Sequence, residues 1–215
     1  MSNICINIKG LYKKFVNKEI FIDANVAISQ NSITALSGPN ASGKTTLLKL
    51  ISGLLLPEKG EITVCGYSIY NPKKVKQYCS VAFNTDLGFY PQLTLNENLN
   101  FLSRIYANNS DIVKFAIDKL QLNPYLNDRF ALVSSGIKTR LWLVSTLIKQ
   151  PKVLLIDELS KSVDYDAKEC IYELINILKK EFKMTILFVS HDIEEIKKLS
   201  DSWIKIENYK LVIIK

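Results

Sequence analysis

Residues 38–46 read GPNASGKTT, and this stretch decides the fold. It fits the pattern G-x-x-x-x-G-K-[ST], with the fixed positions at Gly38, Gly43, Lys44 and Thr45. The run follows an apolar strand pattern and precedes a leucine-rich helical pattern. That context makes the motif specific, because glycines at a strand-to-helix turn let backbone N–H groups close around phosphate oxygens. The sequence therefore predicts a nucleotide-binding loop.

Two side chains of the loop carry charge or metal chemistry. Lys44 is expected to reach the β and γ oxygens of a nucleotide, and the Thr45 hydroxyl is expected to ligate Mg²⁺. The partial positive charge of the following helix N-terminus adds to the attraction for phosphate. A plain glycine turn before an amphipathic helix would not require the Lys-Thr pair, so we favour the phosphate loop.

Around the loop, strand patterns alternate with helix patterns. Isoleucines alternate with polar residues at 4–8, and a second such segment covers 19–28, which predicts an antiparallel flap. Further elements are predicted in the rest of the chain: strands at 32–38, 61–66, 76–83, 153–157 and 184–192, a helix that stops at Gly53, and a long helix near 167–181. Strands that alternate with helices indicate a parallel α/β core.

The middle of the chain has a purely helical pattern. Thr94 and Glu97 have the spacing of a capping box, and a stripe of large apolar residues follows at helical spacing. A second helix is predicted at roughly 110–121. We therefore expect a single domain over residues 1–215, with a core and β flap formed by residues 1–85 and 150–215 and a helical subdomain at about 86–149.

Three polar side chains are expected at one edge of the sheet. Asp157 ends the buried strand VLLID, so its carboxylate would lie where ligands of parallel sheets bind and could hold Mg²⁺ through water. Glu158 follows directly and could orient and deprotonate an attacking water. His191 follows the strand TILFVS and should emerge at the same edge. A surface glutamate or an ordinary lone histidine are the alternatives.

The bulk composition limits the function classes. The chain has 215 residues, 47% of them hydrophobic, and no apolar run near the roughly 20 residues that cross a bilayer. We expect a cytoplasmic protein without a signal peptide. The four cysteines are scattered without a C-x-x-C pair, which predicts core residues rather than a metal or disulfide framework. The net charge of +7 is spread along the chain and is weak evidence for a nucleic-acid partner.

In order and spacing, these motifs resemble the ATP-binding cassette family, specifically the ATPase subunit of an ABC transporter. GPNASGKTT resembles Walker A, VLLIDE resembles Walker B with Glu158 as the catalytic glutamate, and SHD resembles the switch around His191. VSSGIKTRL at 133–141 resembles the signature motif, and SKSVD resembles the D-loop that ends at Asp164. The resemblance implies an α/β P-loop NTPase fold, namely an ABC-type ATPase core with an antiparallel β flap and an α-helical subdomain.

The resemblance also assigns site residues and cofactors, ATP and Mg²⁺. It makes Glu158, His191 and Lys44 catalytic, and Thr45, Asp157 and Asp86 metal-binding. The remaining ATP-binding positions are Phe15, Gly38, Pro39, Asn40, Ala41, Ser42, Gly43 and Thr46. Phe15 would stack on adenine, although a phenylalanine at a strand end is also typical of a core.

The signature residues are implied to act on a second subunit's ATP. Ser134, Ser135 and Gly136 would contact the γ-phosphate that the other chain holds, so two chains, identical or different, would pack head to tail. A serine there could also be a plain helix N-cap. Arg140 matches the arginine that follows the signature.

Several positions depart from the common family pattern. The common signature has two consecutive glycines followed by Gln, where this chain has Ser135, Gly136 and Ile137. The Q-loop glutamine is replaced by Thr85 or Asp86, and Leu159 stands where proline is usual. A Ser-Ser-Gly signature and an acidic Q-loop resemble the ABC-2 type exporters. The altered Q-loop also leaves open a slow enzyme.

The implied partner is a separate membrane-spanning permease subunit, with this chain bound peripherally at the cytoplasmic face of the membrane. The region from about 84 to 106 would supply the groove for that partner, unless its aromatic residues form the insert's own core. The alternatives are a soluble relative that acts on nucleic acid or the ribosome, and a nucleotide-dependent regulator with little turnover. No nucleic-acid partner is expected.

Overall fold

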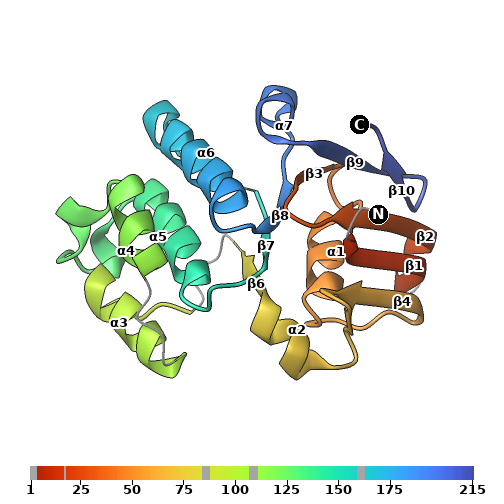
Figure 1. Ribbon diagram of the computed structural model, residues 1–215, viewed down its shortest axis with the longest axis horizontal. Coiled ribbons are helices and arrows are strands. Elements are labelled where there is room, and N and C mark those ends of the chain that lie inside the picture. Colours follow the sequence, from red (N-terminus) through yellow and green to blue (C-terminus); the bar gives the residue numbers. More distant parts are fainter. Residues whose placement is uncertain (1–3, 17, 84–87, 107–110, 159–162) are drawn as a thin grey trace. The chain divides into compact units, whose positions relative to one another are not determined.

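The computed structural model describes residues 4–16, 18–83, 88–106, 111–158 and 163–215 (Figure 1). The chain divides into two compact units. The strand unit comprises residues 1–81, 151–159 and 178–215, and the helical unit comprises residues 82–150 and 160–177. The assignment of residues 1–215 to a single domain with the boundaries given above stays a prediction.

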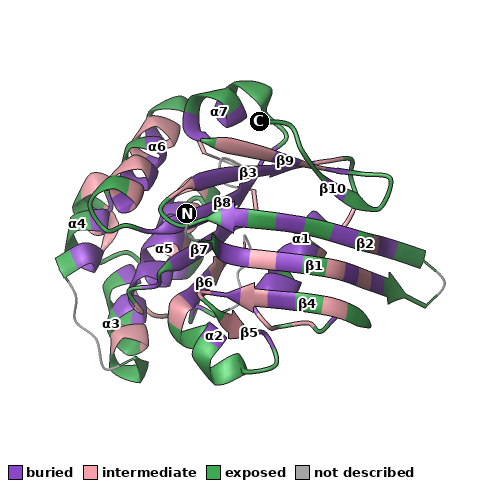
Figure 2. Cartoon of the chain, turned by 45° about the vertical axis from the view of Figure 1, so that its right-hand side comes forward, coloured by how far each residue is buried: buried purple, intermediate pink, exposed green. Residues whose placement is uncertain are grey.

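The first sheet of the strand unit is the expected antiparallel flap. Its four strands lie in the order β2-β1-β4-β5. Their bounds are Ile4–Phe15 for β1, Lys18–Ser29 for β2, Lys59–Val64 for β4 and Tyr67–Ser68 for β5. Buried and exposed residues alternate along β2 and much of β1 (Figure 2), because one face of the sheet is covered and the other is not.

The second sheet has six strands in the order β10-β9-β3-β8-β7-β6. β9, β3, β8 and β7 are parallel, and β10 pairs antiparallel with β9. The bounds are Ile33–Ser37 for β3, Cys79–Ala82 for β6, Val153–Ile156 for β7, Thr185–Val189 for β8, Ser202–Glu207 for β9 and Lys210–Ile213 for β10. Every residue of β3, β7 and β8 is buried, as their continuous apolar runs predict (Figure 2).

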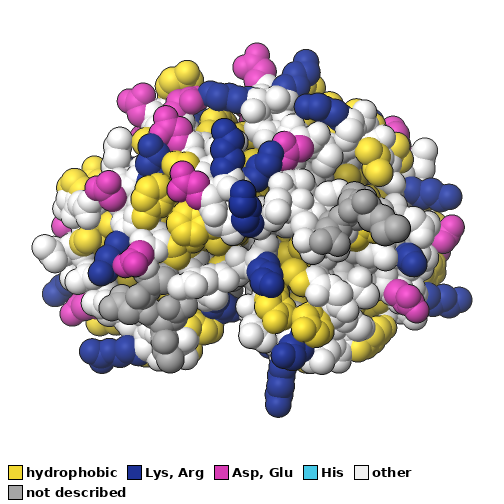
Figure 3. Space-filling view, viewed as in Figure 1, with side chains coloured by type: hydrophobic (Ala, Val, Ile, Leu, Met, Phe, Trp, Pro, Cys, Tyr) yellow, Lys and Arg dark blue, Asp and Glu magenta, His cyan; other side chains and the backbone are white. Residues whose placement is uncertain are grey.

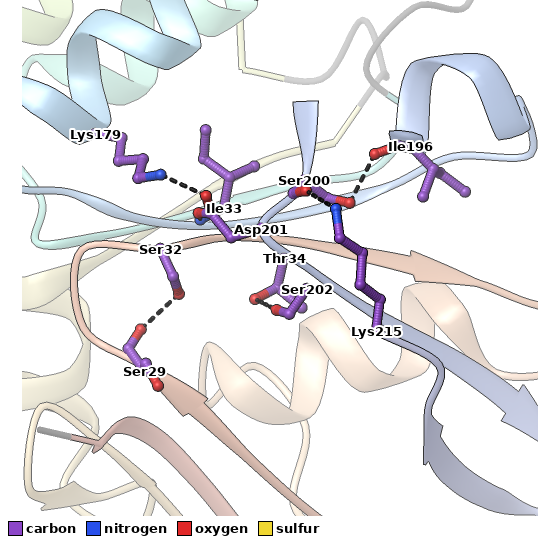
Figure 4. Close-up of polar contacts among 10 residues, drawn as sticks. All are labelled: Ser29, Ser32, Ile33, Thr34, Lys179, Ile196, Ser200, Asp201, Ser202 and Lys215. Carbon is purple, nitrogen blue, oxygen red and sulfur yellow. Dashed lines mark hydrogen bonds and ion pairs between the residues drawn. The ribbon is translucent and has the colours of Figure 1, made fainter. Parts of the chain in front are cut away.

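Polar contacts fix the amino end of β3. Asp201 accepts a hydrogen bond from the Ile33 backbone N–H at 2.7 Å and forms an ion pair with Lys179 at 2.5 Å (Figure 4). One residue along, the hydroxyls of Thr34 and Ser202 lie 2.8 Å apart. These contacts hold β3 against β9, so the loop that leaves the other end of β3 starts from a fixed strand.

In the described part of the strand unit, the helices are α1 (Lys44–Ile51), α2 (Pro72–Tyr78) and α7 (Ile193–Leu199). α1 ends where predicted, with Gly53 at a positive φ of 70°. The predicted strand at 76–83 is wrong in its first three residues, which belong to α2. Asn71 accepts a hydrogen bond from the Lys74 N–H and Pro72 follows it, so this N-terminal cap sets the helix and delays the strand to Cys79.

The helical unit contains α3 (Leu95–Ile105), α4 (Asp111–Lys119) and α5 (Ser135–Leu147), with short 3₁₀ turns at Asn123–Tyr125 and Phe130–Leu132. α6 (Tyr165–Lys180) belongs to it through residue 177. The predicted capping box is present, with the Thr94 hydroxyl and the Glu97 carboxylate each bonded to the other's backbone N–H. None of the helices among the described residues is long and apolar enough to cross a membrane.

Candidate active site

The loop after β3 is shaped by glycine. Gly43 is the residue before α1, and its φ of 107° is one that a residue with a Cβ rarely adopts. A Cβ there would collide with the Ile20 side chain and lie 3.1 Å from the Phe21 ring. No side chain caps the first N–H groups of α1, so these donors and the helix dipole are open to an anion.

Lys44 folds back over this loop. Its Nζ donates to the carbonyl oxygens of Gly38 and Pro39, each at 2.9 Å, and the residue is buried. Burial lowers the pKa of Lys44, while the charges of Asp157 and Glu158 oppose that shift. The ammonium is thus held above the loop by acceptors that a phosphate oxygen could replace.

Ser42 gives an independent sign that the loop is built for an anion. Its hydroxyl oxygen is buried and has no hydrogen-bond partner among the residues that the structure describes. A buried hydroxyl without a partner is costly. A phosphate oxygen beside the loop would accept a hydrogen bond from it.

Thr45 and Asp157 join the two motifs. The Thr45 hydroxyl donates to Asp157 Oδ2 at 2.7 Å, although 112 residues separate them. Asp157 follows β7, and the loop before Thr45 follows β3, so strand order within one sheet brings the carboxylate to the hydroxyl. One hydroxyl and one carboxylate form the hard oxygen set that Mg²⁺ takes together with phosphate oxygens and water. Asp86, the third predicted metal ligand, lies outside the described residues, as does Thr85.

A cavity of about 370 Å³ gathers most of the predicted residues. Its lining is Phe15, Lys18, Ile20, Asn40, Ala41, Gly43, Lys44, Thr45, Thr46, Asp157, Glu158 and His191. Gly38, Pro39 and Ser42 do not line it; Pro39 and Ser42 instead line a second cavity of about 380 Å³. The sequence analysis did not predict Lys18 and Ile20 as cavity residues. The one feature of the sequence that could have pointed to them is that they follow closely after Phe15.

Glu158 and His191 reach this cavity from neighbouring strands. Glu158 comes two residues after β7 at a positive φ of 59°, and His191 comes two residues after β8 and is exposed. β7 and β8 are parallel, with Ile156 paired to Phe188, so both side chains emerge at the same sheet edge. Asp192 caps α7 through the N–H groups of the next turn, which fixes the backbone beside His191.

Phe15 is the last residue of β1, and its side chain is 44% exposed. That exposure excludes the core alternative for this residue. The Lys13 ammonium lies 5.1 Å from the centre of the ring, and Lys13 itself is held by Glu58 at 2.8 Å. A fixed, exposed ring at the cavity wall offers a flat surface for stacking.

The signature residues lie in the helical unit. Ser134 is the N-cap of α5, and its hydroxyl accepts from the Ile137 N–H at 3.3 Å, so the N-cap interpretation holds for this serine. Ser135 is exposed at the first position of the helix, with Gly136 next to it. Of the two signature serines, Ser135 is therefore the one that does not cap α5 and whose exposed side chain can contact a ligand.

Two further predicted residues have structural contacts. Asp164 accepts from the Ala167 N–H at 2.9 Å at the start of α6; the D-loop residues 160–162 lie outside the described part of the chain. Arg140 is buried, donates to the Leu120 carbonyl at 3.0 Å and lies 6.0 Å from the Tyr125 ring. Arg140 thus links α5 to the end of α4 inside the helical unit.

The chain resembles known proteins over nearly its whole length. A family profile described as ABC transporter matches residues 21–161. The ABC transporter ATP-binding protein NatA of Bacillus subtilis is 34% identical over 88% of this chain and 79% of its own length. The spermidine/putrescine import ATP-binding protein PotA of Legionella pneumophila is 32% identical over 94% of this chain, which spans only 56% of PotA.

The Nod factor export ATP-binding protein I of a Bradyrhizobium species is 29% identical over 94% of this chain and 67% of its own length. Among solved structures, an ATP-binding subunit of an ABC transporter has a TM-score of 0.86 at 24% identity over 96% of this chain and 88% of its own. A dimeric ATP-binding cassette bound to ADP and Pi has a TM-score of 0.83 at 20% identity over 96% of both chains. These structures share the fold described above.

Proposed function

The chain belongs to the ABC transporter family and is an ATP-binding ATPase of that family, and we propose that it drives a separate membrane-spanning subunit by dimerising on ATP. One observation carries the proposal. Lys44, Thr45, Asp157, Glu158 and His191, from three different strand ends, line one cavity in front of an uncapped helix N-terminus. That arrangement fits a nucleoside triphosphate and the water that attacks it.

We assign one task to each residue of this cavity. Lys44 and the N–H groups of the loop hold the β and γ phosphates, and Phe15 stacks on the adenine. Thr45 and Asp157 would hold Mg²⁺, which neutralises charge on the phosphates when bound. Glu158 orients the attacking water and accepts its proton, and His191 donates to the γ-phosphate.

The adenine assignment predicts a defect in binding alone. Replacing Phe15 by Ala should raise the KM for ATP about tenfold, because stacking of an aromatic side chain on a base contributes about 1–3 kcal/mol. The kcat at saturating ATP should stay within about twofold, since the ring does not touch the reacting phosphate. Steady-state kinetics measure both.

Val16→Ala is the matched control, because Val16 follows Phe15 and is 89% exposed. It should behave as the wild type. A Phe15→Ala enzyme with an unchanged KM would remove Phe15 from the adenine site.

Dimerisation follows from the number of motifs in the chain. One chain carries one phosphate loop, in the strand unit, and one signature segment, in the helical unit. Two chains that pack head to tail would place Ser135 and Gly136 of each against the ATP of the other. The open N-terminus of α5, with Ser135 exposed, supports that role.

The mass of the Glu158→Gln protein in solution tests this assembly. With ATP and Mg²⁺ it should be a dimer, and with ADP a monomer, because only the γ-phosphate joins the two chains. Adding Ser135→Arg should remove the ATP-dependent dimer, since a long cation would fill the contact without removing the Ser134 cap.

Asn100→Arg is the control for added charge and bulk, because Asn100 is an exposed residue of α3 in the same unit. It should leave the dimer intact. A persistent monomer of the Glu158→Gln protein with ATP would contradict assembly by this chain alone and would favour a regulatory cassette.

Exposed aromatic residues of the helical unit support a protein partner. Phe89 is core, with ring centres 4.9 Å from both Phe130 and Trp142. In contrast, Tyr90 and Phe101 are 51% and 40% exposed and pack edge to face at 5.0 Å. The predicted partner groove thus splits into a buried half and an exposed half, and we assign the exposed half to the membrane subunit.

Binding of that subunit would place the chain peripherally at the cytoplasmic face of the membrane. We propose export as the direction, supported by the resemblance of the Ser-Ser-Gly signature to ABC-2 type exporters. The relatives include both an import protein and an export protein at similar identity, so the direction rests on that motif.

The distribution of surface charge bears on the nucleic-acid alternative. The face shown in Figure 3 carries Asp, Glu and apolar side chains as well as Lys and Arg. Nucleic-acid binding by charge requires cations gathered along one surface. The net charge of +7 is therefore compatible with an ordinary solvated surface.

A further inference from the structure

Two cysteines that lie far apart in the sequence meet in the strand unit. Cys5 is near the start of β1, and Cys65 directly follows β4. Their sulfur atoms are 3.6 Å apart, and both are free thiols. Cys5 is a core residue, as the sequence predicts, and Cys65 is half-buried; that the two lie side by side is not apparent from their sequence spacing.

Strand register causes the meeting. β1 and β4 are antiparallel with Ile6 opposite Val64, so the next step places Cys5 opposite Cys65. The Cys65 N–H donates to the Cys5 carbonyl oxygen at 2.7 Å, which continues the ladder through this pair. Cys65 itself lies in the turn after β4 with a positive φ of 50°, and the sulfur distance of 3.6 Å shows that its side chain points toward that of Cys5.

The backbone spacing suits a covalent bond between them. The Cys5 and Cys65 backbones are joined by the 2.7 Å hydrogen bond described above, and the sulfur atoms already lie 3.6 Å apart. Disulfides span Cα distances of about 4.4–6.8 Å. The sulfurs must move closer by about 1.5 Å, from 3.6 Å to the S–S bond length of about 2.05 Å.

A cavity leads to the two sulfurs. It has a volume of about 370 Å³ and is lined by both cysteines, with Lys152, Lys183, Thr185 and Phe182 among its other residues. Lys152 and Lys183 are exposed, so the entrance carries positive charge. Cys5 as a residue is only 3% exposed, which favours a small, anionic reagent over a protein thiol as its reactant.

The two thiols differ in acidity. The contact with Cys65 lowers the pKa of Cys5 to about 7, and the Thr185 hydroxyl and the Lys152 charge act in the same direction against the effect of burial. The same contact and burial raise the pKa of Cys65. Cys5 is therefore the thiolate that attacks, and Cys65 is the thiol that resolves.

We propose that Cys5 and Cys65 form a reversible thiol–disulfide site that reacts with small anionic disulfides. The Cys5 thiolate attacks one sulfur of a disulfide RSSR, whose S–S bond breaks and releases RS⁻. Cys65 then loses its proton to solvent and attacks Cys5 Sγ, which releases the second RS⁻ and forms the Cys5–Cys65 bond. Two protein thiols are oxidised, and one RSSR is reduced to two small thiols.

The experiment uses the full chain after complete reduction. Oxidised glutathione, a small anionic disulfide, is added near pH 7, the reaction is stopped with acid, and free thiols are alkylated. Mass spectrometry should show two alkyl groups per chain instead of the four of the reduced control, a peptide pair linked through Cys5 and Cys65, and alkylated Cys79 and Cys170. Dithiothreitol should restore both thiols.

Single variants identify the two steps. In Cys65→Ser, Cys5 should keep a stable glutathione adduct, because no resolving thiol remains. In Cys5→Ser, Cys65 should react at least about tenfold more slowly than the wild-type pair. Cys170→Ser is the matched control and should form the bond as the wild type does.

Three results would overturn the proposal: full alkylation of Cys5 and Cys65 after the treatment, a bond to Cys79 or Cys170 instead, or a lasting adduct on wild-type Cys5. The peptide map of the wild type decides between these outcomes even where a serine variant does not fold. The measurement does not involve ATP, so it stands apart from the proposed function.

Discussion

Replacing Glu158 by Gln should lower the rate of ATP hydrolysis by on the order of 100-fold or more and leave ATP binding intact. Glutamine has nearly the shape of glutamate, but it accepts no proton from the attacking water. The loop, Lys44 and the Thr45–Asp157 hydrogen bond of 2.7 Å are untouched by the change. A loss of turnover without a loss of affinity would separate general-base catalysis from binding.

Turnover is measured by phosphate release, and affinity by titration with a fluorescent ATP analogue. The matched control is Glu181→Gln, an exposed glutamate shortly before β8 and thus beyond the other edge of the sheet from His191. The control should hydrolyse ATP at the wild-type rate. If Glu158→Gln also kept the wild-type rate, Glu158 would not be the base.

Replacing Lys44 by Ala should abolish measurable hydrolysis, with a fall in turnover on the order of 100-fold or more, and should weaken ATP binding as well. The ammonium is the only charged side chain of residues 38–46, and no other cation of the loop can replace it at the phosphates. Its present acceptors are the Gly38 and Pro39 carbonyl oxygens, so the group is already positioned above the loop.

Lys49→Ala is the control, because Lys49 is an exposed lysine of the same helix, α1. It should keep wild-type affinity and turnover. A comparison of thermal unfolding with and without ATP gives a second measure: ATP should stabilise the control and not Lys44→Ala. If ATP also stabilised Lys44→Ala, at the same ATP concentration that stabilises the wild type, the assignment of Lys44 to the phosphates would be contradicted.

Local patterns explain why much of the fold was predictable. The capping box of Thr94 and Glu97, the helix stop at Gly53 and the buried strands β3, β7 and β8 each depend on residues within one short segment. The fold class is confirmed by the likeness to solved ATP-binding cassettes. The strand prediction at 76–78 failed because the Asn71 cap and Pro72 outweigh the apolar pattern that follows.

The sequence by itself determined the phosphate loop and the order of the motifs, because a loop that wraps a phosphate is built from consecutive residues. Tertiary structure decided which residues face one another. It exposed Phe15, buried Phe89 and gave Arg140 the carbonyl oxygen of Leu120, just after α4, as a partner. It also set Cys5 beside Cys65, 60 residues away, because the register of β1 and β4 is fixed by pairing between strands that no local pattern encodes.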